Sequence, residues 1–247
     1  MLLPTSTPLN PPMPTTLPKL LLAIVLSLTC LQGWGQEPKS PFAKWEKSIA
    51  AYEKADATRP PPQGGILFVG SSTIRKWVTL EQDFPGLPVF NRGFGGSQIA
   101  DSTHFASRII IPYAPRMVIF HAGDNDLASG KSAEAVFADL KELIATIHAK
   151  LPETTFCYIS IKPTEKREKL REAQKAFNQS VQDLAKVDSR VRYIDSYDLV
   201  ADADGNPRPE LFEADRLHFK AAGYKLLTAQ VLPFLKNPKI VAKHCNP

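Results

Sequence analysis

Four short polar clusters stand out in this chain of 247 residues, three directly after an apolar run and one beyond a loop. Two are rich in small or hydroxyl-bearing residues, and two contain carboxylates beside an amide or an imidazole. The clusters are Gly70-Ser71-Ser72-Thr73, residues 91–97, residues 121–126 and Asp215-Arg216-Leu217-His218. A serine, a histidine and an acid together can transfer an acyl group through a covalent intermediate, and this is the chemistry that the clusters predict.

Ser72, His218 and Asp215 are the residues expected to react. A serine at a strand-to-helix turn presents its hydroxyl, and His218 can accept the hydroxyl proton. Asp215 precedes His218 by three residues. One tight turn therefore places the carboxylate near the imidazole, where it holds the tautomer that a base requires.

Donors for a developing negative charge occur in the same clusters. The N–H of Ser72 would lie at a helix N-terminus, where free N–H groups favour an anion. Gly95 and Gly96 let the backbone approach a substrate without a Cβ in the way, and Asn125 supplies an amide donor. The simpler interpretations are an N-cap for Ser72, turn residues for the glycines and Asn125, and a cap of the last helix for Asp215.

Five apolar runs are expected to form the strands that position these clusters. They are mostly continuous rather than alternating, which is typical of parallel strands covered on both faces. The runs are 66–69, 88–90, 117–120, 156–161 and 191–194. Ligands bind beyond the carboxyl ends of parallel strands, so all four clusters would open on one edge of the sheet.

Amphipathic segments alternate with these runs. Apolar residues repeat at helical spacing, for example at Val136, Leu140 and Leu143. Helices are expected at 41–55, 73–80, 133–150, 166–187 and 220–235. This alternation of strands and helices predicts one three-layer α/β domain with a parallel sheet.

Taken together, the four clusters resemble the signature blocks of the SGNH-hydrolase superfamily, the GDSL-type esterases, lipases and acylhydrolases. Those blocks are, in chain order, a Gly-Asp-Ser motif, a glycine loop, a Gly-x-Asn-Asp motif and an Asp-x-x-His motif. All four occur here in that order, and the resemblance covers roughly residues 64–236. The departure is Ser71, which stands where the common motif has Asp.

The resemblance implies a flavodoxin-like α/β/α fold with about five parallel strands. It implies that Ser72 is the nucleophile, His218 the base and Asp215 the third member of a catalytic triad. It also implies an oxyanion hole formed by the N–H groups of Ser72 and Gly96 and the side chain of Asn125. No cofactor or metal is expected, because the family uses none.

Other polar residues near the predicted site have weaker patterns. His121 ends the third run and is expected to serve packing or substrate contact, whereas His148 is expected to face solvent. Arg75 and Arg92 would suit an anionic substrate, although a surface arginine needs no such explanation. Cys157 lies inside the fourth run and is expected to be a buried small hydrophobe.

The chain begins with a segment, residues 1–35, that is expected to be a cleaved export signal. Its apolar core at 20–28 is too short to span a bilayer, and the small residues Gly33 and Gly35 lie where a signal peptidase would cleave. The alternatives are translation from Met13, an uncleaved membrane anchor and a lipid anchor on Cys30. Export would deliver the protein to the periplasm or the extracellular space.

Charge and cysteine content exclude other classes. Formal net charge is +5 with the charges mixed along the chain, and no basic stripe carries interleaved aromatics, so nucleic-acid binding is not expected. The three cysteines lack the spacing of a zinc site or a disulfide framework, and a Cys157–Cys245 bridge is a minor alternative. Residues 36–247 are therefore expected to form a single domain without stable membrane insertion.

The expected reaction is hydrolysis of a carboxylic ester through an acyl-enzyme on Ser72. The favoured substrates are short acyl esters on a small molecule or a polysaccharide, such as acetyl groups on carbohydrates or glycans. Two alternatives stay open, namely lysophospholipase or acetylhydrolase action on lipid esters, and a non-catalytic binding module on the same fold.

Overall fold

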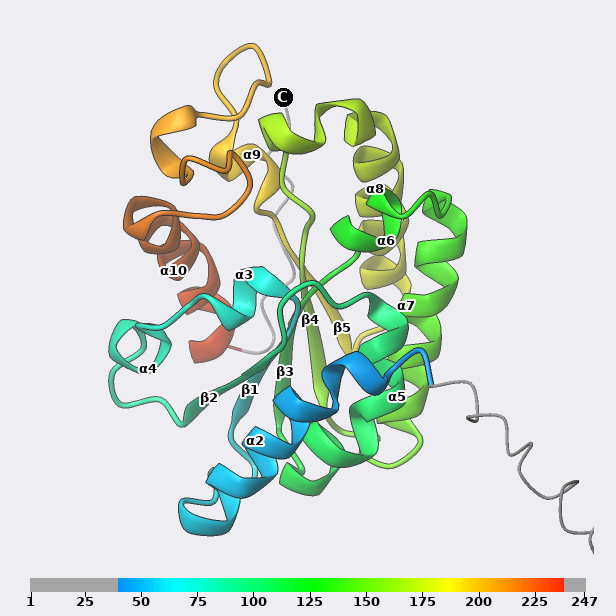
Figure 1. Cartoon of the computed structure of the whole chain (residues 1–247), viewed down its shortest axis with the longest axis vertical. Helices are drawn as coiled ribbons and strands as arrows, with labels where there is room; N and C mark the ends of the chain where they lie inside the picture. The colour runs from blue at the N-terminus through cyan, green and yellow to red at the C-terminus, as the bar shows by residue number, and fades with distance from the viewer. Residues whose placement is uncertain (1–39, 238–247) are drawn as a thin grey trace, which may run out of the picture. The chain divides into compact units, whose positions relative to one another are not determined.

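A five-stranded parallel sheet forms the centre of the computed structural model, which describes residues 40–237. The strands lie in the order β2-β1-β3-β4-β5, and every neighbouring pair is parallel (Figure 1). They are β1 (Ile66–Gly70), β2 (Val89–Gly93), β3 (Met117–His121), β4 (Thr155–Ile159) and β5 (Val191–Ile194). The predicted α/β fold with about five parallel strands is confirmed.

Helices cover both faces of the sheet and bury it. They are α2 (Glu46–Thr58), α3 (Ser72–Arg75), α4 (Leu80–Asp83), α5 (Ile99–Ile109), α6 (Asp124–Ala128), α7 (Ala133–His148), α8 (Arg171–Val187), α9 (Tyr197–Val200) and α10 (Ala221–Lys236). Side chains alternate along each strand, so Leu67 and Val69 join one apolar core while Ile66 and Phe68 join the other. Helices α2, α5, α7 and α8 pack over the first core, and α3, α4 and α10 over the second (Figure 1).

The edge strand β2 is longer than the predicted run 88–90. It continues through Asn91 and Arg92, two polar residues that a buried central strand would rarely contain. Asn91 Nδ2 donates to the Ile74 carbonyl at 2.7 Å, and Arg92 pairs with the Asp56 carboxylate. Partners from the flanking helices α3 and α2 therefore allow the strand to continue.

Helix α5 is present in the structure but was not predicted from the sequence. Its buried positions include Ile99, Phe105 and Ile109, which lie on one face. A capping box closes its first turn: the Gln98 side chain accepts from the backbone of Asp101, and the Asp101 carboxylate accepts the Gln98 N–H at 2.8 Å. Both signals are present in the sequence.

Two predicted helices are interrupted. The one expected at 166–187 starts as a 3-10 helix, η4 (Glu165–Leu170), and becomes regular only in α8. The one expected at 73–80 is split into α3 and α4, with turns between them. Trp77 in those turns is buried, and its Nε1 donates to Asp83 Oδ2 at 2.6 Å, so the break serves to place the indole in the core.

His148 contradicts the expectation of a solvent-facing side chain. It is buried at the end of α7, where its Nε2 lies 3.0 Å from the Thr154 carbonyl. Burial is the main cause that lowers the pKa of His148 below its ordinary value. The prediction was wrong because the turn that follows α7 brings Thr154 back to the ring.

The predicted N-terminal helix is present as a 3-10 turn, η2 (Ala43–Trp45), and α2, and charges fasten it to the domain. Arg92 lies among three aromatic rings and pairs with Asp56 of α2. Arg108 of α5 contacts two glutamates of α2, each at 2.7 Å. Helix α2 is thus a fixed part of the domain.

The predicted export signal at residues 1–35 lies outside the described residues, as do Cys30 and Cys245. Within residues 40–237, no helix is long and apolar enough to cross a membrane. Cys157 is buried in β4 as a free thiol, as expected, and burial raises its pKa to about 12.

We expect Asp56→Asn to lower the free energy of unfolding by about 2–4 kcal/mol, because it leaves Arg92 buried without a counter-charge. Urea denaturation measures the change. Glu81→Gln is the matched control, since Glu81 and Arg59 form a 3.9 Å pair between largely exposed side chains and its loss should cost less than about 0.5 kcal/mol. Equal effects would contradict a special role for the buried pair.

Candidate active site

The first polar cluster leaves β1 through a sharp turn at Gly70. Its φ of +135° is a conformation that other residues rarely adopt, and a Cβ there would lie 2.2 Å from the His121 carbonyl oxygen. The Ser71 N–H donates to that same carbonyl at 2.9 Å. Ser72 then begins α3, so its own N–H has no acceptor within the helix.

His218 connects Ser72 to Asp215. Its Nε2 lies 2.9 Å from Ser72 Oγ, and its Nδ1 lies 2.6 Å from Asp215 Oδ2. With the proton assigned to Nδ1, the ring donates to the carboxylate and Nε2 accepts the serine hydroxyl. The structure therefore brings together the three residues predicted from the sequence, in the order that general-base activation requires.

A tight turn holds the Asp215 carboxylate. Asp215 Oδ1 accepts the backbone N–H groups of Leu217 and His218, each at 3.0 Å. The contact with the His218 ring, followed by these backbone bonds, holds the pKa of Asp215 well below its ordinary value. The N-cap of α10 is Lys220, so the alternative interpretation of Asp215 as the cap of the last helix was wrong.

The three predicted oxyanion donors belong to residues that line one pocket, namely Ser72, Gly96 and Asn125. The Gly96 N–H forms no backbone hydrogen bond with any residue of the described chain. Asn125, in the first turn of α6, donates one amide N–H to the Ser97 carbonyl at 3.0 Å. Its second N–H remains available, because an amide carries two.

This pocket has a volume of about 330 Å³. All four predicted clusters contribute to its walls, and α2 adds one residue from the N-terminal side. The lining residues are Ser48, Ser72, Arg75, Lys76, Gly95, Gly96, Asn125, Leu217 and His218. Only Leu217 among them has an apolar side chain. Within residues 40–237, no group of three or more His, Cys, Asp or Glu side chains could hold a metal ion.

The two aspartates that flank Asn125 hold it in place and do not line the pocket. The carboxylate of Asp126 is buried and accepts the Ile99 N–H at 3.1 Å, and burial raises its pKa to about 6. Asp124 Oδ1 accepts Gln174 Nε2 at 3.0 Å, which joins α6 to α8. The third cluster therefore supplies one candidate donor and two structural acids.

His121 takes the packing role, one of its two expected roles. It is buried at the end of β3, with Nδ1 3.1 Å from the Ile159 carbonyl. Burial is the main cause that lowers its pKa to about 3, so the ring is neutral near pH 7. The side chain does not line the pocket.

The four clusters omit Lys162, which is buried against the helix that begins at Ser72. Its Nζ donates to Thr73 Oγ1 at 3.2 Å and lies 4.7 Å from the Phe219 ring centroid. Burial is the main cause that lowers the pKa of Lys162 to about 8. Its sequence signal is its place just after β4. None of the four clusters directly follows the carboxyl end of that strand.

Ser71, the departure from the common motif, is buried at the N-cap position of α3 and makes no capping hydrogen bond. Ser72 is the serine that contacts His218.

Of the two arginines considered for an anionic substrate, Arg75 lines the pocket, whereas Arg92 is buried in its ion pair with α2. The sequence contained no comparable signal for Ser48.

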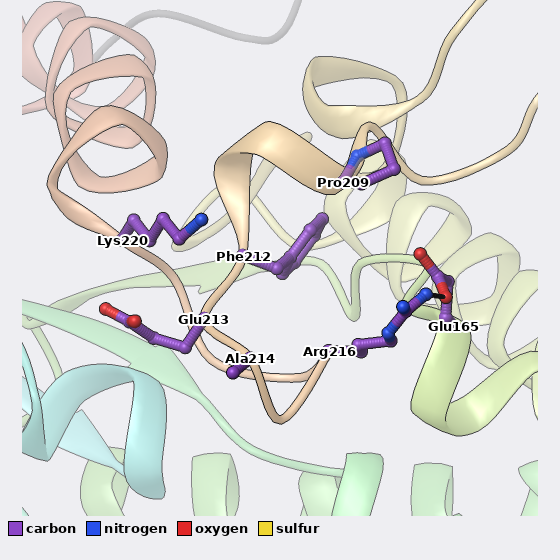
Figure 2. A pocket seen from close by; sticks show the side chains of 7 residues that line it. All are labelled: Glu165, Pro209, Phe212, Glu213, Ala214, Arg216 and Lys220. Carbon is purple, nitrogen blue, oxygen red and sulfur yellow. Dashed lines mark hydrogen bonds and ion pairs between the residues drawn. The ribbon is translucent and has the colours of Figure 1, made fainter.

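A second pocket of about 420 Å³ adjoins the turn that carries Asp215 (Figure 2). Figure 2 shows Phe212 between Lys220 and the ion pair that Arg216 forms with Glu165. Its lining residues are Glu165, Pro209, Phe212, Glu213, Ala214, Arg216 and Lys220. Neither Ser72 nor His218 is among them, so this pocket neighbours the site without containing the reacting groups.

The comparison with known families agrees with this geometry. A profile of the GDSL-like Lipase/Acylhydrolase family matches residues 67–226, which is more than half of the chain. The chain belongs to this family. As a GDSL-like lipase/acylhydrolase it is a carboxylic ester hydrolase, and the predicted kinship with SGNH hydrolases is confirmed. No curated protein matches the chain.

Solved structures show the same fold. A candidate platelet activating factor from Streptococcus pneumonia has a TM-score of 0.69 at 21% identity, with 85% of this chain and 99% of that one covered. A GDSL-like lipase from Bacteroides thetaiotaomicron has a TM-score of 0.65 at 18% identity, covering 77% and 98%. A catalytic mutant of an acetylxylan esterase from Geobacillus stearothermophilus has a TM-score of 0.59 at 15% identity, covering 74% and 99%. This GDSL-like lipase/acylhydrolase therefore shares its architecture with several ester hydrolases.

Proposed function

We propose that the protein is a serine esterase that hydrolyses short-chain esters, favouring acetyl groups on carbohydrates or glycans, through an acyl-enzyme on Ser72. The observation that carries the proposal is the hydrogen-bonded line from Ser72 Oγ through both nitrogens of His218 to Asp215. A serine alone at this position would be a weak nucleophile, whereas an imidazole nitrogen 2.9 Å away can accept its proton and so activate it.

In the first half of the reaction, Ser72 Oγ attacks the acyl carbon while its proton passes to His218 Nε2. The carbonyl oxygen becomes an oxyanion, which the N–H groups of Ser72 and Gly96 and the free amide N–H of Asn125 would stabilise. Asp215 stabilises the imidazolium and keeps its orientation. The C–O bond to the alcohol then breaks, and His218 returns the proton to the departing oxygen.

In the second half, water replaces the alcohol. His218 takes a proton from the water, the hydroxide oxygen attacks the acyl carbon, and the bond from that carbon to Ser72 Oγ breaks. The same proton then moves from His218 to Ser72 Oγ, which restores the enzyme and releases the acid. All these steps use only the residues already described.

The character of the pocket supports a short acyl group and a polar alcohol. It holds about 330 Å³, and Leu217 is its one apolar side chain. A long acyl chain would need a larger apolar surface to repay its removal from water. The likeness to an acetylxylan esterase points the same way, whereas preferential hydrolysis of a lysophospholipid over acetylated xylan would contradict this substrate choice.

Export is part of the proposal, and we expect a mature chain that begins near Gln36. The short apolar core at 20–28 and the small residue Gly35 support cleavage there. Intact-mass measurement of the exported protein tests it. A chain that retains residues 20–35, or one with a lipid on Cys30, would contradict cleavage at this position.

Asn125→Ala is expected to lower kcat by about 10²–10³, the scale for one oxyanion donor. KM should change much less, because the donor acts mainly on the transition state. Steady-state kinetics with p-nitrophenyl acetate measures both. Gln174→Ala is the control, since Gln174 contacts the same short helix through Asp124 but lines no part of the pocket. An unchanged kcat in Asn125→Ala would make Asn125 a structural residue only.

The two adjacent serines give the sharpest test of the nucleophile. Ser72→Ala should abolish labelling by a fluorophosphonate probe and lower kcat by about 10⁴-fold or more, and His218→Ala should resemble it, because the two act as a unit. Ser71→Ala should keep the burst of acyl-enzyme with a modest loss of rate. Mass spectrometry locates the label, and stopped-flow kinetics measures the burst.

Label on Ser71, or a labelled and active Ser72→Ala variant, would overturn the assignment. Absence of any label on the folded wild-type protein would instead favour a non-catalytic binding module on the same fold.

A further inference from the structure

Two cations stand at the catalytic pocket, and both come from the end of the helix that the nucleophile begins. Arg75 is the last residue of α3 and Lys76 follows it. Both side chains are exposed, and both line the pocket together with Ser72 and His218. Residues three apart in a helix lie on one face, so the spacing from Ser72 to Arg75 fixes the guanidinium on the nucleophile's side.

The glycine loop gives Arg75 its place. A Cβ on Gly95 would lie 2.7 Å from Arg75 Nε and 3.3 Å from its Cδ, so the side chain lies directly against this loop. Any larger residue at position 95 would displace the guanidinium. The cation is thereby held beside Gly96, one of the proposed oxyanion donors.

Neither cation has an ion-pair or hydrogen-bond partner in the part of the chain that the structure describes. Most arginines of the described chain pair with carboxylates, as Arg92 does with Asp56 and Arg108 with two glutamates. Arg75 and Lys76 form no ion pair and no side-chain hydrogen bond within residues 40–237. Five guanidinium N–H donors and three ammonium donors are therefore available to a ligand.

The two pockets differ in the charges of the side chains that line them. No acidic side chain lines the catalytic pocket. The pocket in Figure 2 combines Glu165 and Glu213 with Arg216 and Lys220, and Arg216 is already paired with Glu165. A concave surface whose charged side chains are all cationic attracts anions and raises their local concentration.

We propose that Arg75, assisted by Lys76, forms an anion subsite that selects esters bearing a carboxylate or a phosphate close to the scissile bond. The proposal rests on the esterase function and adds a substrate class to it. The planar guanidinium matches both anions through paired N–H donors, whereas the ammonium acts as a point charge. Paired, charge-assisted hydrogen bonds of this kind correspond to a preference of about 10-fold.

Matched esters test the subsite by kinetics. We compare kcat/KM for para-acetoxybenzoate, a carboxylate, and para-acetoxyphenyl phosphate with that for the neutral methyl para-acetoxybenzoate. Para-nitrophenyl hemisuccinate against para-nitrophenyl butyrate places the charge on the acyl side instead. Because each anionic-to-neutral ratio is compared between variants, intrinsic differences in ester reactivity cancel.

Arg75→Gln should lower at least one anionic-to-neutral ratio about 10-fold, and Lys76→Gln should lower it less. Arg75→Lys should retain part of the preference, and about 0.5 M NaCl should reduce it in the wild type. Lys150→Gln, which removes an exposed cation that lines neither pocket, is the control and should leave every ratio unchanged. The pair of esters whose ratio changes most identifies the preferred anion, carboxylate or phosphate. It also shows whether the subsite binds the alcohol side or the acyl side of the ester.

Binding to Ser72→Ala separates this proposal from the esterase function. Calorimetric titration gives Kd for the same esters without turnover, and adding Arg75→Gln should weaken the anionic ligand about 10-fold relative to the neutral one. A charge-dependent Kd without turnover in the wild type would support the subsite and reject the esterase. Ratios that Arg75→Gln leaves unchanged in every arm, by kinetics and by Kd, would overturn the subsite.

Discussion

The hydrogen bond between Ser72 and His218 is the interaction on which the rest of the site depends, because it joins segments from opposite ends of the domain. It is possible because α3 and α10 cover the same face of the sheet. Thr73, the residue after Ser72, reinforces the contact: its carbonyl accepts Tyr224 Oη of α10 at 2.9 Å, and its hydroxyl accepts Lys162 Nζ at 3.2 Å. The start of α3 is thus held from the last helix and from the loop after β4.

Most of the fold, and the grouping of the candidate site residues around one pocket, were predictable because they follow from local patterns and one rule of topology. Continuous apolar runs marked the five strands, and parallel strands present their carboxyl ends on one edge. That rule was enough to group Gly96, Asn125 and His218 before any contact was known. The spacing of Asp215 and His218 was equally informative, since one turn determines it.

What could not be predicted depends on partners distant in sequence. His148 is buried by the turn at Thr154, and Arg92 stays inside the domain because Asp56 of α2 meets it. Lys162 is a cation whose burial depends on Thr73 and Phe219, residues that no pattern places beside it. Helix α5 is different, because its capping box and apolar spacing lie within residues 98–109. The sequence therefore contains enough information to predict this helix.

Helix α2 precedes the region that the family profile matches, residues 67–226, yet its Ser48 forms part of the catalytic pocket wall. One part of the pocket wall therefore comes from outside the region that supplies Ser72, His218 and Asp215. A substitution in α2 can change this part of the wall without changing Ser72, His218 or Asp215. A profile confined to residues 67–226 carries no information on this part of the wall, although the wall would meet the substrate.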